Sequence, residues 1–262
     1  MLSLFHFPDP AEFTLFTLVL GRMGGLFSAI PLFGGKGVPA RIKITIVFTM
    51  TLIFFPVVRA HLTRVPTDVL SLGLLVSREV LIGLSLGLLS QVIFSAVEFC
   101  GQFIGMQMGF TTASMFDPTM GTQTAVLSVL ENLLATLLFM TLGMHHLFLN
   151  AIIESYRVVP LGAWHVNGAL LAFVVSTTGG IFTLAIKLAA PLMASLLAAT
   201  VSLGVMARIF PQMNIFMMSF PLNIGLGFIV LGITAKVFFH TLSNSFANLS
   251  QQMSILFRLL GA

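Results

Sequence analysis

The chain has 262 residues, of which 57% are hydrophobic and only 8% are charged, and its formal net charge is +4. Soluble domains carry about 25% charged residues, so this composition excludes a soluble enzyme or a soluble binding module and indicates a membrane protein. The 12 basic residues are scattered along the chain, which argues against nucleic-acid binding. The single cysteine, Cys100, cannot form an internal disulfide.

The apolar stretches predict an all-α, polytopic membrane-type fold with six or seven hydrophobic helices. The first 13 residues contain two acidic residues and no basic one, so we expect no cleavable signal peptide. Stretch 169–207 is too long for one span, and Pro191 predicts a kink within it. The predicted apolar segments cover about 13–33, 42–58, 69–99, 124–153, 169–207 and 222–240.

The aromatic composition is skewed, with 26 Phe but one Tyr and one Trp. Membrane helices often place Tyr and Trp at both headgroup levels. Here Tyr156 and Trp164 fall in one predicted loop, so no pair of aromatic belts is expected. Either Lys and Arg anchor the helices, or many of the helices are covered by other protein rather than by lipid.

The last twenty residues predict an amphipathic helix. Its polar face carries Ser, Asn and Gln with one basic residue, Arg258, whereas a membrane-surface helix usually carries several Lys or Arg. We therefore expect it to pack against a partner helix. The apolar face of this C-terminal helix is formed by Leu242, Phe246, Leu249, Met253, Leu256, Phe257 and Leu260.

The orientation of the chain in the membrane is indicated by its charges. The acidic N-terminus and a basic first loop favour an N-terminus outside the cell.

No catalytic, cofactor-binding or metal-binding pattern is recognisable in the sequence, so we expect no enzyme and no cofactor. The adjacent His145 and His146 point in different directions on a helix and lack a metal-binding motif. More informative are charges within apolar segments, since each costs about 2.5–3.5 kcal/mol if it faces lipid. We expect these charged residues to form salt bridges between helices or subunits, and the alternative is an ion or proton relay. The charged residues within apolar segments are Arg22, Arg78, Glu79, Glu98, Glu131, Lys187 and Lys236.

Segment 98–121 combines recurrent glycines with Met and Phe. Gly101, Gly105 and Gly109 recur every four residues, which allows another backbone to approach closely, and Asp117-Pro118 should end the helix. Methionine adapts to irregular surfaces, and irregular backbone at membrane depth must be buried in protein or line a cavity. The composition of segment 98–121 fits both a deformable seal around a pore and an ordinary helix–loop packed within a bundle. The Met and Phe residues of this segment are Met106, Met108, Met115, Met120, Phe103, Phe110 and Phe116.

Over nearly its whole length the chain resembles the FliR family of flagellar type III export-gate proteins, which is related to the SctT components of injectisomes. Each motif alone is weak, and their order and spacing carry the resemblance. In chain order they are Arg22 with Pro31 and the turn 34–41, Glu79-x3-Gly83-x3-Gly87, the Gly101/Gly105/Gly109 series leading to Asp117-Pro118, Tyr156 with Pro160-Leu161-Gly162, Pro191, Gly204-x3-Arg208, Pro211-Gln212-x-Asn214-x-Phe216 and Phe220-Pro221-Leu222.

The resemblance implies a non-enzymatic subunit of a helical export gate at the flagellar basal body in the bacterial inner membrane. Its partners would be multi-copy FliP and FliQ, FlhB, FlhA, unfolded flagellar substrates and membrane lipid. Residues 1–190 would be a FliP-like portion and 191–262 a FliQ-like hairpin. The loop at about 105–121 would plug the channel, and Arg208 would join the buried charges in polar contacts. The plug residues would be Gly105, Met106, Met108, Gly109, Phe110, Met115, Phe116, Asp117 and Pro118.

A secondary transporter for a small solute is the rival interpretation. It would need inverted repeats and polar residues that converge at mid-membrane, and the two halves of the sequence show no convincing repeat. An intramembrane enzyme ranks third, because no nucleophile–base pair or metal-ligand pattern is present. Only the resemblance separates a flagellar role from a role in injectisomes.

Overall fold

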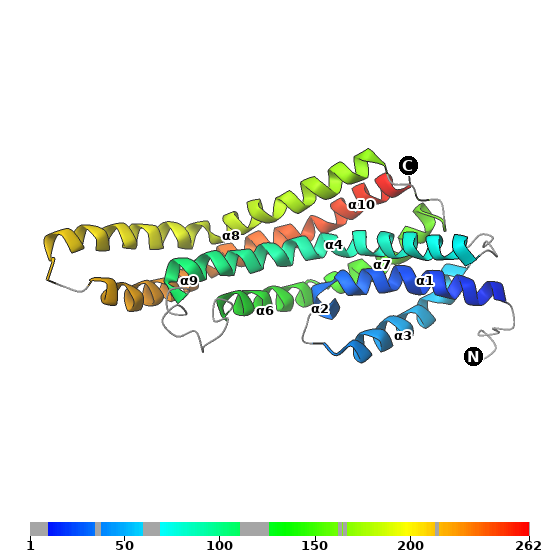
Figure 1. Ribbon diagram of the computed structural model, residues 1–262, viewed down its shortest axis with the longest axis horizontal. Coiled ribbons are helices and arrows are strands. Elements are labelled where there is room, and N and C mark those ends of the chain that lie inside the picture. The colour runs from blue at the N-terminus through cyan, green and yellow to red at the C-terminus, as the bar shows by residue number, and fades with distance from the viewer. Residues whose placement is uncertain are drawn as a thin grey trace. The chain divides into compact units, whose positions relative to one another are not determined.

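The computed structural model describes residues 10–34, 38–59, 69–110, 126–161, 164, 167–212 and 215–261. Within these ranges all regular secondary structure is helical, which confirms the all-α prediction. The helices, drawn in Figure 1, are α1 (Pro10–Ala29), α2 (Pro31–Gly34), α3 (Ala40–Arg59), α4 (Val69–Met108), α6 (Val126–Thr141), α7 (Met144–Val158), α8 (Gly168–Ile209), α9 (Ile215–Ala247) and α10 (Leu249–Leu260).

Four helical segments in the described part of the chain are long and apolar enough to cross a membrane, and the bent pair α6–α7 would make a fifth. Of the one or two helices that 169–207 left open, the structure has one, because α8 continues through Pro191 as a single helix of 42 residues. Apolar surroundings offer few alternative partners for backbone groups, so helical hydrogen bonding persists on both sides of the proline. The four segments are Ala40–Arg59, Leu70–Met108, Gly168–Ile209 and Met217–Leu260.

The predicted helix 124–153 is in fact two helices, α6 and α7, separated by a break at residues 142–143. Gly143 lies at the break with a φ of 67°, a left-handed conformation that glycine adopts without a Cβ penalty. The Gly143 carbonyl accepts the first bond of the next turn, from the His146 N–H at 3.0 Å. Helix α7 continues to Val158, so Tyr156 lies in a helix and not in the predicted loop.

Two compact units are assembled from interleaved segments of the chain. Unit 1 combines 1–92, 143–178 and 247–262, and unit 2 combines 93–142 and 179–246. Helices α4 and α8 therefore contribute residues to both units. The proposed division at residue 191 concerns similarity to other subunits and stays a prediction.

Phenylalanines form the centre of unit 2. The rings of Phe94, Phe139 and Phe246 contact one another, with centroids 5.6–5.9 Å apart. All three side chains are buried, and they come from α4, α6 and α9. Part of the large Phe content therefore serves packing between helices rather than contact with lipid.

The predicted apolar face near the C-terminus is largely buried. Leu249, Met253, Leu256 and Leu260 of α10 are at most 3% exposed, whereas Phe257 is only half-buried. In unit 1, α10 packs against α7, and the Asn167 side-chain amide donates to the α10 backbone. The helix that covers this face thus belongs to the same chain.

Candidate functional site

Helices α1 and α4 of unit 1 approach so closely that only glycine fits at their contact. A Cβ added to Gly83 would lie 2.8 Å from the Leu26 nitrogen and even closer to the Arg22 carbonyl oxygen. A Cβ on Gly25 would lie 2.9 Å from the Leu84 nitrogen. Because both neighbours are backbone atoms, neither position accepts a side chain unless the helices separate.

Beside this contact, Arg22 and Glu79 form a buried ion pair. Arg22 Nε donates to Glu79 Oε2 at 2.6 Å, and both side chains are 0% exposed. Glu79, Gly83 and Gly87 are spaced by four residues and therefore share one face of α4. The same helix face thus carries the carboxylate and the small residues that let the arginine helix reach it.

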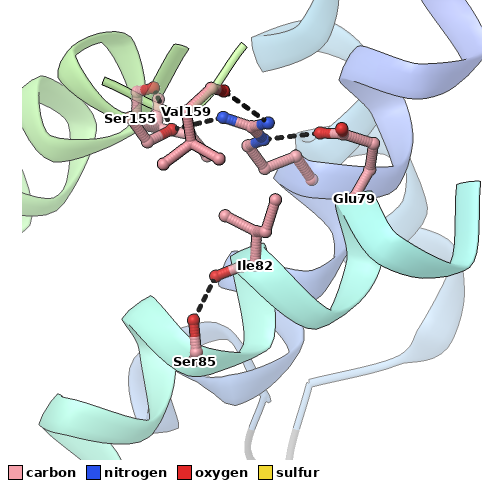
Figure 2. A network of polar contacts seen from close by, with 7 residues as sticks. Glu79, Ile82, Ser85, Ser155 and Val159 are labelled. Carbon is pink, nitrogen blue, oxygen red and sulfur yellow. Dashed lines mark hydrogen bonds and ion pairs between the residues drawn. The ribbon is translucent and has the colours of Figure 1, made fainter. Parts of the chain in front are cut away.

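Helix α7 and Val159, the residue that directly follows it, supply further contacts of the guanidinium. Arg22 Nη1 donates to Ser155 Oγ at 3.0 Å, and Nη2 donates to the Val159 carbonyl at 3.2 Å. Figure 2 shows Ser155 and Val159 on one side of this group and Glu79 on the other. The ring of Tyr156 lies against the cation, with its centroid 3.9 Å from Arg22 Cζ.

This Arg22 cluster, formed by Arg22, Glu79, Ser155, Tyr156 and Val159, is a structural junction of α1, α4 and α7. The ionic partners are both fully buried, so a charge left without its partner would be costly. The cation is matched by a carboxylate, a hydroxyl, a carbonyl and an aromatic face. The cluster therefore links the three helices through one ion pair and two further hydrogen bonds of the guanidinium.

The end of α4, in unit 2, contains the second group of predicted residues. Gly101 lies against α6, where an added Cβ would be 2.7 Å from the Ser128 nitrogen. Ser128 Oγ donates to the Glu98 carbonyl at 3.1 Å, which joins the same two helices. Gly105 is buried, and Gly109 has a φ of 92° immediately after the last residue of α4.

The two methionines in this stretch have different environments. Met106 is 60% exposed, whereas Met108 is fully buried. Met108 packs on Gly227 of α9, where an added Cβ would lie 2.6 Å from the Met108 Cε. Phe110 is half-buried. The other predicted plug residues, Met115, Phe116, Asp117 and Pro118, lie outside the described residues.

The other predicted charges have varied surroundings. Glu131 is buried and lines a small cavity of about 40 Å³ in unit 2. Arg78 is half-buried, and the Glu98 side chain is exposed. Three cations on the long C-terminal helices are exposed, namely Lys187 and Arg208 on α8 and Lys236 on α9. In the described part of the chain, no group of three His, Cys, Asp or Glu residues could hold a metal ion.

The fold and the buried polar junction define a polytopic, all-α membrane protein. Residues 13–249 match the family described as bacterial export proteins, family 1. This match covers well over half of the chain, so the chain belongs to that family. The resemblance to FliR proteins predicted from the motifs is thereby confirmed.

Curated relatives share most of their length with this chain. The flagellar biosynthetic protein FliR of Bacillus subtilis (strain 168) is 32% identical over 254 residues, which cover 95% of this chain and 96% of the relative. The FliR protein of Caulobacter vibrioides is 35% identical over 83% of this chain and 86% of its own. The Escherichia coli (strain K12) protein is 32% identical over 79% of this chain and 78% of its own.

Proposed function

We propose that this chain is a structural, pore-forming subunit of the flagellar type III export gate, where it helps to form and seal the channel for unfolded flagellar proteins. Its family and its FliR relatives support membership of the flagellar export apparatus. Nothing in the proposed role requires catalysis by the chain. The site of action would be the inner membrane at the flagellar basal body.

The observation that carries the proposal is the length and exposure of α8. At 1.5 Å per residue its 42 residues extend for about 63 Å along the helix, about twice the hydrocarbon thickness of a bilayer. Helix α8 contains an apolar stretch of 18 residues, and only 11% of that stretch is buried by the rest of the chain. A helix tilted by 40° would still exceed the membrane by many ångströms, so part of this surface needs protein neighbours.

The same argument applies to α9. The segment Met217–Leu260, of which α9 is the greater part, contains an apolar stretch of 18 residues of which only 6% is buried within the chain. FliP and FliQ subunits, with FlhB and FlhA, are the neighbours that we propose for these surfaces. In this proposal residues 1–190 correspond to a FliP-like portion and residues 191–262 to a FliQ-like hairpin.

For the seal we propose different roles for Met106 and Met108, the two methionines at the end of α4. Met108 would anchor the segment, because it is buried against Gly227 in unit 2. Met106, which is 60% exposed, would face the channel together with residues that follow Gly109. The left-handed conformation of Gly109 supports a change of chain direction at this point.

Purification of the tagged full-length chain in mild detergent tests the assembly. FliP and FliQ should accompany it through two purification steps. A clean monomer would contradict the proposed role. The same preparation compares Met106→Ala with the wild type, and both should retain the partner subunits.

A conductance measurement on the assembled gate tests the seal. Deletion of residues 111–116 should leave co-purification intact and make the reconstituted gate leak ions. A deletion of equal length at 62–67, between α3 and α4, is the matched control and should leave the gate tight. If the 111–116 deletion is assembled and equally tight, the plug role of this segment is wrong.

A further inference from the structure

A cavity of about 330 Å³ lies between α1 and α3 in unit 1. This volume is within the range of about 300–1,000 Å³ that is usual for ligand pockets. Leu20 and Phe27 of α1 face Ile44, Val47 and Phe48 of α3 across it. Apart from Ser28 and Lys43, all its lining residues are apolar or glycine. Such walls suit a hydrocarbon chain rather than a polar metabolite.

One charged side chain, Lys43, lines the cavity. Its ammonium donates to the Gly34 carbonyl, at the end of α2, with an N–O distance of 2.9 Å. This bond uses one of the three donors of the ammonium. Lys43 also lies in the first turn of α3, one of the membrane-capable helices, where a basic side chain is expected near the headgroups.

Gly24 keeps the cavity open. A Cβ at this position would meet one side-chain atom, Val47 Cγ1, at 3.9 Å. This environment is unlike that of the neighbouring Gly25, whose Cβ would collide with the backbone of α4. The glycine at 24 is therefore not required by a helix contact, and its missing side chain adds to the space between α1 and α3.

We propose that this cavity binds one acyl chain of an anionic phospholipid whose phosphate pairs with Lys43. The apolar walls match the acyl chain, and the ammonium at the start of a membrane-capable helix matches the charge of the headgroup. Basic sites between membrane helices bind anionic headgroups by this combination. Free phosphate is a poorer match, because it would gain nothing from the apolar walls. This site does not depend on the proposed channel role.

Photo-labelling of the full-length chain in its export complex tests the site. The complex is reconstituted with phosphatidylglycerol that carries a diazirine in one acyl chain and, separately, with phosphatidylcholine that carries the same group. Peptides covering 20–33 and 43–48 should be labelled several-fold more by the anionic lipid. Equal labelling by the two lipids, or no labelling of these peptides, would overturn the proposal.

Two variants separate the acyl-chain contact from the headgroup contact. Gly24→Leu should fill the cavity and abolish labelling of both peptides, whereas Lys43→Gln should remove the preference for phosphatidylglycerol. Gly73→Leu is the matched control, since a Cβ there meets no atom within 4 Å and the residue lies outside the cavity. Labelling that persists in Gly24→Leu would contradict the site. If Gly24→Leu fails to assemble, an unchanged lipid preference in Lys43→Gln would contradict it equally.

Discussion

The Arg22 cluster and the long C-terminal helices satisfy their side chains in opposite ways. In the cluster, a fully buried arginine has its charged and polar partners within unit 1. On α8, Leu171, Val175 and Val201 are all more than 60% exposed, although the helix is strongly apolar. One region is complete within the chain, and the other presents an apolar surface to its surroundings.

This difference shows that hydrophobicity alone does not identify the neighbours of a helix. Helix α4 is also apolar, yet 56% of its apolar 18-residue stretch is buried by this chain. The corresponding share for α8 is 11%. Glycines at the α1 contact and a buried ion pair explain why α4 finds its neighbours within the chain. Substitutions in the two regions should therefore affect different properties, namely the stability of the chain and its assembly.

The largest loss of stability should come from Arg22→Ala. This change leaves the Glu79 carboxylate buried without its cation, which typically costs about 3–5 kcal/mol. The thermal unfolding midpoint of the purified chain and its amount in the membrane should both fall sharply. Arg157→Ala is the control, since the exposed Arg157–Glu154 pair should contribute at most about 1 kcal/mol. Equal effects of the two substitutions would contradict a stabilising role of the buried pair.

Met108→Ala should follow, with a loss of about 2–5 kcal/mol, because truncation of a buried Met leaves a cavity. Met106→Ala, two residues earlier, should change the unfolding midpoint little, because Met106 is 60% exposed. Thermal unfolding of both variants measures the contrast. If Met106→Ala is the more destabilising of the two, the anchoring role proposed for Met108 is wrong.

Gly83→Ala should cost about 1–3 kcal/mol, since the added methyl group forces α1 and α4 apart. Gly73→Ala on the same helix meets open space and should be neutral or stabilising, because alanine favours helix by about 1 kcal/mol. The difference between the two unfolding midpoints isolates the cost of the helix contact. A Gly83→Ala variant as stable as Gly73→Ala would show that the contact tolerates a side chain.

Local patterns predicted much of the secondary structure. The second apolar segment, expected at 42–58, corresponds to α3 at Ala40–Arg59, because helix periodicity and flanking basic residues are local signals. The buried residues of α10 were predicted from their spacing for the same reason. The unequal burial of Met106 and Met108 was not predicted: residues two apart on a helix do not share a face, but the spacing does not say which of the two is buried.

Long-range pairing was not accessible from the sequence. Glu79 is separated from Arg22 by 57 residues and Ser155 by 133, and no local pattern selects them from the other polar residues. The role of Tyr156 was missed because helix α7 was expected to end near residue 153. The skew in aromatic composition, with one Tyr and one Trp beside 26 Phe, was the sequence feature that could have drawn attention to Tyr156. The one Tyr and the one Trp are both buried, so neither forms an interfacial belt.

The smallest effect on the stability of the chain, and the sharpest test of the comparison, is expected for Ile233→Trp on α9. Ile233 is 74% exposed, so the larger apolar side chain should change the free energy of unfolding of the isolated chain by no more than about 0.5 kcal/mol. The unfolding midpoint should therefore stay nearly unchanged. Lipid would accept the indole, whereas a packed subunit interface would not.

Co-purification of partner subunits is the measurement that distinguishes these surroundings. Loss of FliP and FliQ from Ile233→Trp, with an unchanged midpoint, would show that protein covers this face. Leu242→Trp is the control on the same helix, since Leu242 is fully buried and overpacking should lower the midpoint of the chain itself. Full retention of the partners by Ile233→Trp would instead assign this part of α9 to lipid, because a fluid hydrocarbon neighbour adapts to the added volume.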